Sequence, residues 1–142
     1  MRTWVVDASV AVKWLVPEDL YEVAKLISGR PDRLVAPRLI ITEVANALAR
    51  KTAQGILNGK EAGYLCGTLP VLLPELIDVD DMIAPALANA CQLRHPIYDL
   101  IYLETARRLD AQLITADRRF IAKLANTDLA RHVTLLSDWQ PE

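Results

Sequence analysis

The sequence predicts an α/β protein: a three-layer α/β/α sandwich with a mainly parallel sheet of about five short strands. Three observations predict this class. Short apolar runs alternate along the whole chain with longer segments of helical periodicity. Gly, Pro and Asp stand at the boundaries, and no repeat or low-complexity segment interrupts the alternation. Strands separated by helices pair in parallel through right-handed crossovers, which places helices on both faces of the sheet.

The first half of the chain is expected to hold two strands and three helices. The strands are Thr3–Val6 and Leu34–Ala36, and the helices are Pro17–Ser28, Arg38–Gln54 and Asn58–Thr68. The strands are short and uncharged. Gly29 and Gly55 follow two of the helices at the position where a glycine commonly ends a helix, and Asn58 is a favoured residue at a helix start.

The second half is expected to hold three strands and three helices. The strands are Leu76–Val79, Gln112–Thr115 and His132–Leu136, and the helices are Asp80–Leu93, Ile97–Leu109 and Asp117–Leu124. Pro96 separates the first two helices, because proline has no N–H to donate. With 142 residues, of which 52% are apolar and 24% charged, the chain 1–142 is predicted to form one globular domain.

Four acidic residues are expected at the carboxyl edge of this sheet, where open parallel sheets form their sites. Asp7 and Asp117 directly follow predicted strands, and Glu43 follows the strand Leu34–Ala36 after a turn. Asp99 lies near the start of a helix that runs roughly 16 Å away from the carboxyl edge of the sheet, and the next strand returns to that edge over about the same distance. Asp99 therefore returns to the level of Asp117.

The helical neighbours of two of these acids are apolar. Leu39, Ile40 and Ala47 surround Glu43, and Leu103 and Ala106 follow Asp99 on its helix face. Both acids are therefore expected to face inward. Two carboxylates 4 Å apart repel by about 4 kcal/mol at an effective dielectric constant of ~20. A hard divalent cation is the natural counter-charge for four of them, and an all-oxygen donor set suits Mg²⁺ or Mn²⁺.

The acids lie in the motifs VVDASV, LIITEVANAL, YDLIYLETA and LITADRRF, which in this order resemble the PIN-domain ribonucleases, and more narrowly the VapC-type toxins. The resemblance implies a metal-dependent endoribonuclease with Asp7, Glu43, Asp99 and Asp117 as metal ligands. It also implies that the hydroxyls of Ser9 and Thr115 lie near the metal, with Asn46 one turn beyond Glu43. It further implies a homodimer and inhibition by a cognate antitoxin protein.

Other readings of the same residues remain open. Asp7, Asp99 and Asp117 are also favoured helix caps, and Glu43 could pair with Arg38 or Arg50. The cluster Asp78, Asp80 and Asp81 reads as a hydrated helix start. Arg118 and Arg119 could bind RNA phosphates or simply be exposed. A haloacid-dehalogenase-like phosphatase also places an Asp at a strand end, but it requires a second Asp where Ser9 stands. A non-catalytic interaction module is a third possibility.

The overall composition gives expectations about the binding partners and the location of the protein. The formal charge of −2 gives no general attraction to nucleic acid, although grouped basic residues such as Arg50 and Lys51 allow a local basic rim around an acidic centre. The mean hydropathy of +0.17 suggests apolar surface buried against a partner or a second copy, although a dense core would give the same value. No stretch is long enough to span a membrane, and Cys66 and Cys91 lack the spacing of a metal site. We therefore expect a cytoplasmic protein with buried free thiols, in which Trp4, Trp14 and Trp139 belong to the core or to an interface.

Overall fold

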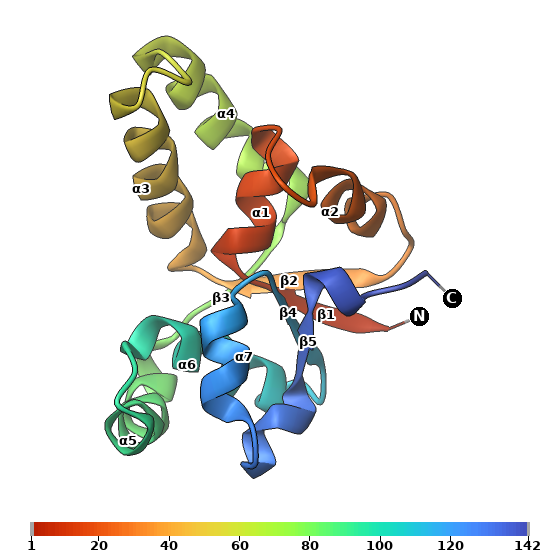
Figure 1. Ribbon diagram of the computed structural model, residues 1–142, viewed down its shortest axis with the longest axis vertical. Coiled ribbons are helices and arrows are strands. Elements are labelled where there is room, and N and C mark those ends of the chain that lie inside the picture. The colour runs from red at the N-terminus through yellow and green to blue at the C-terminus, as the bar shows by residue number, and fades with distance from the viewer. Residues whose placement is uncertain (1, 142) are drawn as a thin grey trace.

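A parallel five-stranded sheet forms the middle layer of the molecule (Figure 1). The computed structural model describes residues 2–141. The strands run in the spatial order β3-β2-β1-β4-β5, and every neighbouring pair is parallel. Their bounds are β1 Thr3–Val6, β2 Arg33–Pro37, β3 Glu75–Ile77, β4 Gln112–Thr115 and β5 Val133–Leu135. The predicted fold class is confirmed.

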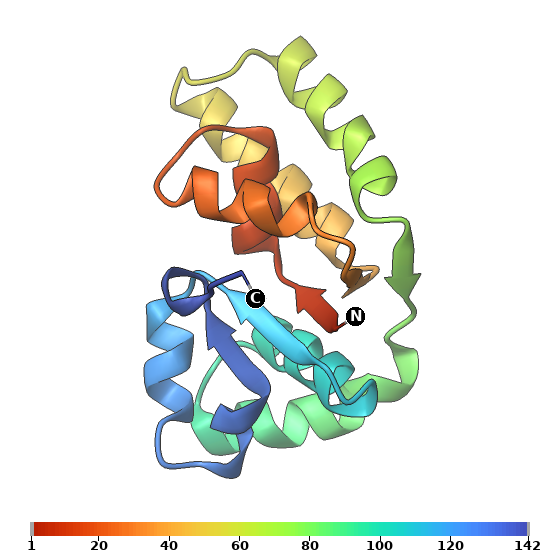
Figure 2. The ribbon, with the colours of Figure 1, turned by 90° about the vertical axis from the view of Figure 1, so that its right-hand side faces the viewer.

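Helices cover both faces of the sheet, as Figures 1 and 2 show. One layer contains α1 Ala8–Leu15, α2 Tyr21–Ser28, α3 Ile40–Ala53 and α4 Gly59–Leu72. The other contains α5 Ile83–Leu93, α6 Ile97–Arg108 and α7 Arg118–Leu124. Three short 3₁₀ helices complete the described chain: η1 Asp80–Met82, η2 Asp128–His132 and η3 Leu136–Asp138.

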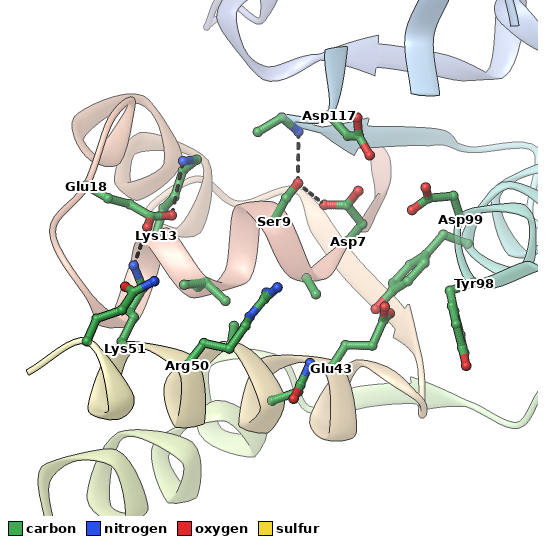
Figure 3. A pocket seen from close by; sticks show the side chains of 17 residues that line it. Asp7, Ser9, Lys13, Glu18, Glu43, Arg50, Lys51, Tyr98, Asp99 and Asp117 are labelled. Atoms are coloured by element: carbon green, nitrogen blue, oxygen red, sulfur yellow. Dashed lines mark hydrogen bonds and ion pairs between the residues drawn. The ribbon is translucent and has the colours of Figure 1, made fainter. Parts of the chain in front are cut away.

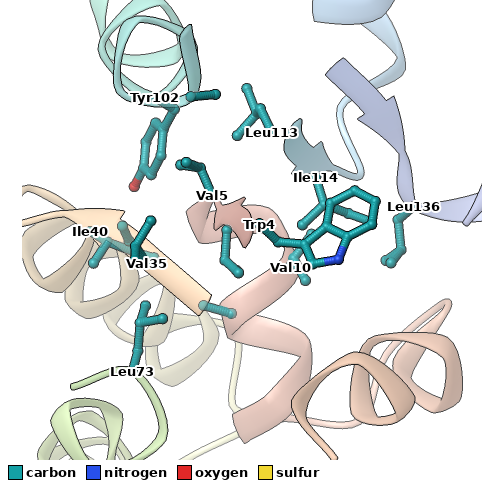
Figure 4. Packing of buried hydrophobic residues seen from close by; sticks show 14 of the residues in the cluster. Trp4, Val5, Val10, Val35, Ile40, Leu73, Tyr102, Leu113, Ile114 and Leu136 are labelled. Atoms are coloured by element: carbon teal, nitrogen blue, oxygen red, sulfur yellow. The ribbon is translucent and has the colours of Figure 1, made fainter. Parts of the chain in front are cut away.

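The core lies on both sides of the central strand β1. Val5 and Val6 are completely buried because β1 has a neighbour on each side and helices on each face. Side chains from both helical layers pack against it, among them Ile40 of α3 and Tyr102 of α6 (Figure 4). The strand end that follows Val6 is therefore held firmly, and it carries Asp7.

Helix α1 was not predicted. Its sequence ASVAVKWL lacks a continuous polar face because α1 is enclosed by the sheet, α2 and α3. The prediction that a helix begins at Pro17 is wrong: Leu20 adopts a left-handed conformation, and α2 begins only at Tyr21.

Smaller differences concern the ends of three elements. Helix α4 continues to Leu72 although Pro70 lies in its last turn. Strand β3 covers Glu75–Ile77 instead of Leu76–Val79 because it pairs with Val35–Pro37 of β2. The segment Asp80–Met82 is a 3₁₀ turn that precedes α5.

The three tryptophans are buried as predicted. Both cysteines are free, but the prediction that they are buried is wrong: Cys91 of α5 is exposed, and Cys66 is half-buried where α4 faces α3. Within residues 2–141, no helix has the length and apolar character needed to cross a bilayer.

Candidate functional site

Asp7 lies at the junction of β1 and α1 and is only 4% exposed. Its backbone N–H donates to the carbonyl of Ile114 in β4, at 3.3 Å. Its Oδ1 accepts hydrogen bonds from the Val10 backbone N–H at 3.3 Å and from the Ser9 hydroxyl. Asp7 is therefore the N-cap of α1, as one of the open readings held. Its other oxygen, Oδ2, accepts neither of these bonds.

Ser9 and Thr115 join the ends of β1 and β4. The Ser9 hydroxyl accepts from the backbone N–H of Ala116 at 3.0 Å and lies 3.5 Å from the Thr115 hydroxyl. Thr115 Oγ1 accepts from the backbone N–H of Asp117 at 3.1 Å. These bonds fix the distance between the two strand ends, so the backbones of Asp7 and Asp117 have a defined separation.

Asp117 and Asp99 reach the same region from the other helical layer. Asp117 caps α7 by accepting from the Phe120 N–H at 3.1 Å. Asp99 does not cap its own helix, whose N-cap is Pro96. Its Oδ2 lies 2.6 Å from His95 Nε2, and the His95 ring stacks on Phe120 at 5.0 Å. The His95 ring therefore orients the Asp99 carboxylate.

Glu43 approaches from α3 on the opposite side. Its Oε1 and the hydroxyl of Tyr102 are both buried, and neither has a hydrogen bond of good geometry within residues 2–141. The two groups are nevertheless close enough that the charge of Glu43 adds to burial in raising the pKa of Tyr102. Glu43 forms no ion pair with Arg38, which binds Asp78 instead, or with Arg50. A buried carboxylate oxygen without a well-aligned donor is costly: burial raises the pKa of Glu43, and the Tyr102 hydroxyl offsets this rise only in part.

One pocket of about 760 Å³ collects these side chains. Six of the predicted site residues line it: Asp7, Ser9, Glu43, Asn46, Asp99 and Asp117. Figure 3 shows Asp7, Asp99 and Asp117 gathered on one side of this space and Glu43 reaching toward it from α3. Thr115 is fully buried beneath the lining.

The structure does not bring the predicted RNA-binding pair into the pocket. Arg118 and Arg119 are at the start of α7 outside the lining, and Arg118 donates to Ser137 at 3.3 Å. The acidic cluster near η1 also lies outside the pocket, since Asp78 pairs with Arg38 and Asp81 with Arg108.

Burial and mutual repulsion raise the pKa values of three of the acids. Burial raises the pKa of Asp7 to about 7, the hydroxyls of Ser9 and Thr115 oppose this rise, and the charge of Asp99 adds to it. Burial also raises the pKa of Glu43 and of Asp99, with smaller increases from the charges of Asp99 and Asp117 respectively. Among the described residues, no Lys or Arg lies within ion-pair distance of the four acids.

The donor set fits a hard divalent cation. Four carboxylates, no cysteine and an orphaned Glu43 oxygen are the chemistry that Mg²⁺ or Mn²⁺ prefers. As these side chains lie, however, no three acidic, His or Cys residues in the range 2–141 are close enough to hold one ion together. Holding one ion between them would therefore require these side chains to move closer together.

The grouped Arg50 and Lys51, which allowed a basic rim in the sequence, do line the same pocket, but the sequence did not predict that Lys13 and Tyr98 join them. Lys13 and Lys51 both bind Glu18, at 3.1 and 2.7 Å. Arg50 and Tyr98 also line the pocket. A signal for Arg50 exists in the sequence, since it lies seven residues, or two helical turns, after Glu43 on the same face of α3.

The sequence is similar to those of known proteins. Residues 4–125 match the family model of the PIN domain. The chain is 29% identical over 121 residues to Ribonuclease VapC3 of Pyrobaculum aerophilum, covering 84% of this chain and 92% of that protein.

Solved structures share the fold at low sequence identity. The crystal structure of PAE2754 from Pyrobaculum aerophilum has a TM-score of 0.71 at 22% identity, over 96% of this chain and 85% of that one. The structure of VapBC-1 from nontypeable Haemophilus influenzae has a TM-score of 0.61 at 17% identity, over 95% of this chain and 98% of that one. The crystal structure of FitAcB from Neisseria gonorrhoeae has a TM-score of 0.60 at 19% identity, over 97% of this chain and 99% of that one.

Proposed function

Because this chain belongs to the PIN-domain family, we propose that it is a metal-dependent endoribonuclease that acts as the toxin of a toxin–antitoxin pair. The observation that carries the proposal is the acidic pocket: four carboxylates from four separate segments line one space, and none has a Lys or Arg partner in the described chain. The similarity to Ribonuclease VapC3 supports the choice of RNA as substrate.

In this proposal Asp7, Glu43, Asp99 and Asp117 hold Mg²⁺ or Mn²⁺. Bound there, the ion would supply Lewis-acid chemistry, lowering the pKa of water and neutralising charge at a phosphodiester. Ser9 and Thr115 fix the strand ends that carry Asp7 and Asp117. Asn46 lines the pocket one turn beyond Glu43. A cation also favours the ionised form of Asp7, whose pKa of about 7 otherwise leaves it half-protonated near neutrality.

Cleavage of total cellular RNA tests the reaction. We expect the wild type to cut RNA with Mg²⁺ or Mn²⁺ and EDTA to abolish cutting. Asp7→Asn and Asp99→Asn should lose more than the ~10–100-fold that removal of an outer-shell partner costs. Asp110→Asn is the matched control, since Asp110 is exposed before β4 at the opposite edge, in a left-handed conformation that Asn tolerates. Full cleavage by both site variants would reject the assignment.

Two alternative functions, a phosphatase and a non-catalytic interaction module, can be distinguished from the proposed ribonuclease. The phosphatase reading needs a second acid two residues after Asp7, but Ser9 stands there and its hydroxyl is engaged by Asp7 and Ala116. Rapid hydrolysis of a small phosphomonoester would favour that reading. The non-catalytic reading would be favoured if calorimetry found no divalent-ion binding at millimolar concentration.

We also propose a cytoplasmic location, a cognate antitoxin and a homodimer. The similarity to the solved structure of VapBC-1 supports the antitoxin. An apolar groove of about 470 Å³ between α3 and α4 supports a protein contact there; Leu48, Ala49, Ala62 and Gly63 contribute to its lining. On the same helix α4, Tyr64 and Val71 are 74% and 80% exposed. Large apolar side chains this exposed are consistent with a surface that contacts another protein.

A further inference from the structure

The pocket has a basic end as well as an acidic one. Lys13, Arg50 and Lys51 line it together with Glu18, and Figure 3 shows Lys13, Glu18 and Lys51 on the side away from Asp99 and Asp117. We propose that this basic end, with Arg50 as its principal contact, binds a backbone phosphate of the RNA within about three nucleotides of the phosphodiester that is cut. The inference rests on the proposed ribonuclease function.

Arg50 differs from the two lysines because it has no anionic partner in the described part of the chain. Its guanidinium extends from α3 into the pocket (Figure 3), and it forms no ion pair or hydrogen bond with any side chain in residues 2–141. An arginine presents five N–H donors in a planar fork that matches two phosphate oxygens. A guanidinium aimed into this cavity therefore lacks an anion, and phosphate is the anion that a ribonuclease pocket receives.

The two lysines beside Arg50 are held in place by one carboxylate. Glu18 accepts from Lys13 Nζ and from Lys51 Nζ, whose side chains are 10% and 15% exposed. Two lysines share one negative charge, so the cluster keeps a net charge of +2 when Arg50 is included. Because Glu18 fixes the lysines in the free protein, little side-chain entropy remains to be lost when an anion binds.

The position of Arg50 suits a strand that passes the acidic end. Seven residues of α3 separate it from Glu43, a rise of ~10.5 Å on the same helix face. Stacked nucleotides advance by about 3.4 Å each, so Arg50 stands about three nucleotides from the acids, or fewer when its long side chain reaches toward them. An acidic pocket alone repels RNA, and the basic end supplies the attraction that offsets this repulsion.

The salt dependence of RNA binding tests this contact without relying on cleavage. The probe is a fluorescently labelled oligouridylate of about 12 nucleotides, within the usual site size of single-strand binders. Binding is followed by fluorescence anisotropy in EDTA between about 50 and 200 mM NaCl. A single-strand phosphate contact contributes a slope of about −0.7 to log K against log[salt].

Arg50→Gln is expected to bind more weakly and to reduce the magnitude of this slope by about 0.7. Glu18→Gln keeps the shape but removes the shared anion, so it is expected to bind more tightly with a steeper slope. Arg131→Gln is the matched control, because Arg131 is exposed before β5 at the opposite edge of the sheet. In cleavage assays with metal, Arg50→Gln should raise KM more than it lowers kcat.

Arg50→Gln with the wild-type slope and affinity would overturn the inference, as would a Glu18→Gln slope that is no steeper than that of the wild type. If the wild type cuts RNA while Arg50→Gln keeps the wild-type slope, the phosphate site alone is wrong. If the wild type neither binds nor cuts RNA, the proposed function fails and the phosphate site fails with it.

Discussion

At the scale of single residues, Asp7 has two roles that oppose each other. It caps α1 and is buried at the central strand end, so folding places its carboxylate where water cannot solvate it. The resulting rise of its pKa to about 7 is caused first by burial. The metal-free protein is therefore less stable with Asp7 ionised than with Asp7 protonated.

The sign of this effect gives a prediction for stability against pH. In the unfolded chain Asp7 ionises near its ordinary pKa of 3.8, whereas in the folded protein it ionises at about 7. The folded state binds the extra proton between these values, so metal-free stability falls as pH rises from about 4 to about 7 and then levels off.

Asp7→Asn removes the ionisation but keeps the cap. We expect little difference from wild type near pH 4, and a variant more stable by as much as about 4 kcal/mol at pH 8. Urea unfolding in EDTA at both pH values measures this difference. A gap that stays constant with pH would contradict the burial of an ionisable Asp7.

At the scale of elements, α3 and α1 determine what the pocket contains. Helix α3 places Glu43, Asn46 and Arg50 along one face. Helix α1 begins after Asp7 and carries Ser9 and Lys13 into the same space. Each helix thus supplies an acid at its start and a base one or two turns later.

The covering helix α4 starts with a capping box that is open to direct test. The Asn58 side chain accepts from the Glu61 N–H at 2.8 Å, and Glu61 accepts from the Asn58 N–H at 3.0 Å. Asn58→Ala is expected to lower the free energy of unfolding by about 1 kcal/mol while leaving cleavage intact. Urea unfolding measures this change in the free energy of unfolding.

The control is Asn89→Ala, inside α5, which should not lower the free energy of unfolding because Ala is the better helix former. An equal decrease in both variants would argue against the capping role.

The elements also show how far sequence reasoning extends. The meeting of four acids in one pocket was predictable, because strand ends and helix faces follow from local patterns, such as the apolar run Trp4–Val6 that ends at Asp7 and the apolar neighbours of Glu43. Helix α1 was not, since most of it is buried and its polar residues, Ser9 and Lys13, are too few to reveal its period. The Lys13–Glu18–Lys51 cluster was hidden because it depends on how α1 packs against α3, which no local pattern reports.

At the scale of the whole molecule, helix α4 presents exposed apolar side chains to the surface. Tyr64 and Val71 project from α4, and the groove between α3 and α4 is apolar. A two-fold dimer would bury the same patch twice and so remove the surplus apolar surface that the mean hydropathy indicates.

Light scattering after size exclusion tests this arrangement. We expect the wild type to have the mass of a dimer and Val71→Asp to have that of a monomer, because the substitution places a charge in the contact of each copy. Leu26→Asp is the control, since Leu26 is an exposed apolar residue on α2, away from α4. If Val71→Asp still has the mass of a dimer, the interface does not include this part of α4.

The central claim is that the four acids together hold a divalent cation, and Mn²⁺ binding measured by calorimetry at pH 8 tests it most directly. The wild type and Asp110→Asn should bind Mn²⁺ equally, because pH 8 lies above the Asp7 pKa of about 7 and leaves this carboxylate mostly ionised. Asp99→Asn should bind at least about tenfold more weakly. Equal Mn²⁺ affinity in the wild type and Asp99→Asn, or no binding by either, would contradict the account.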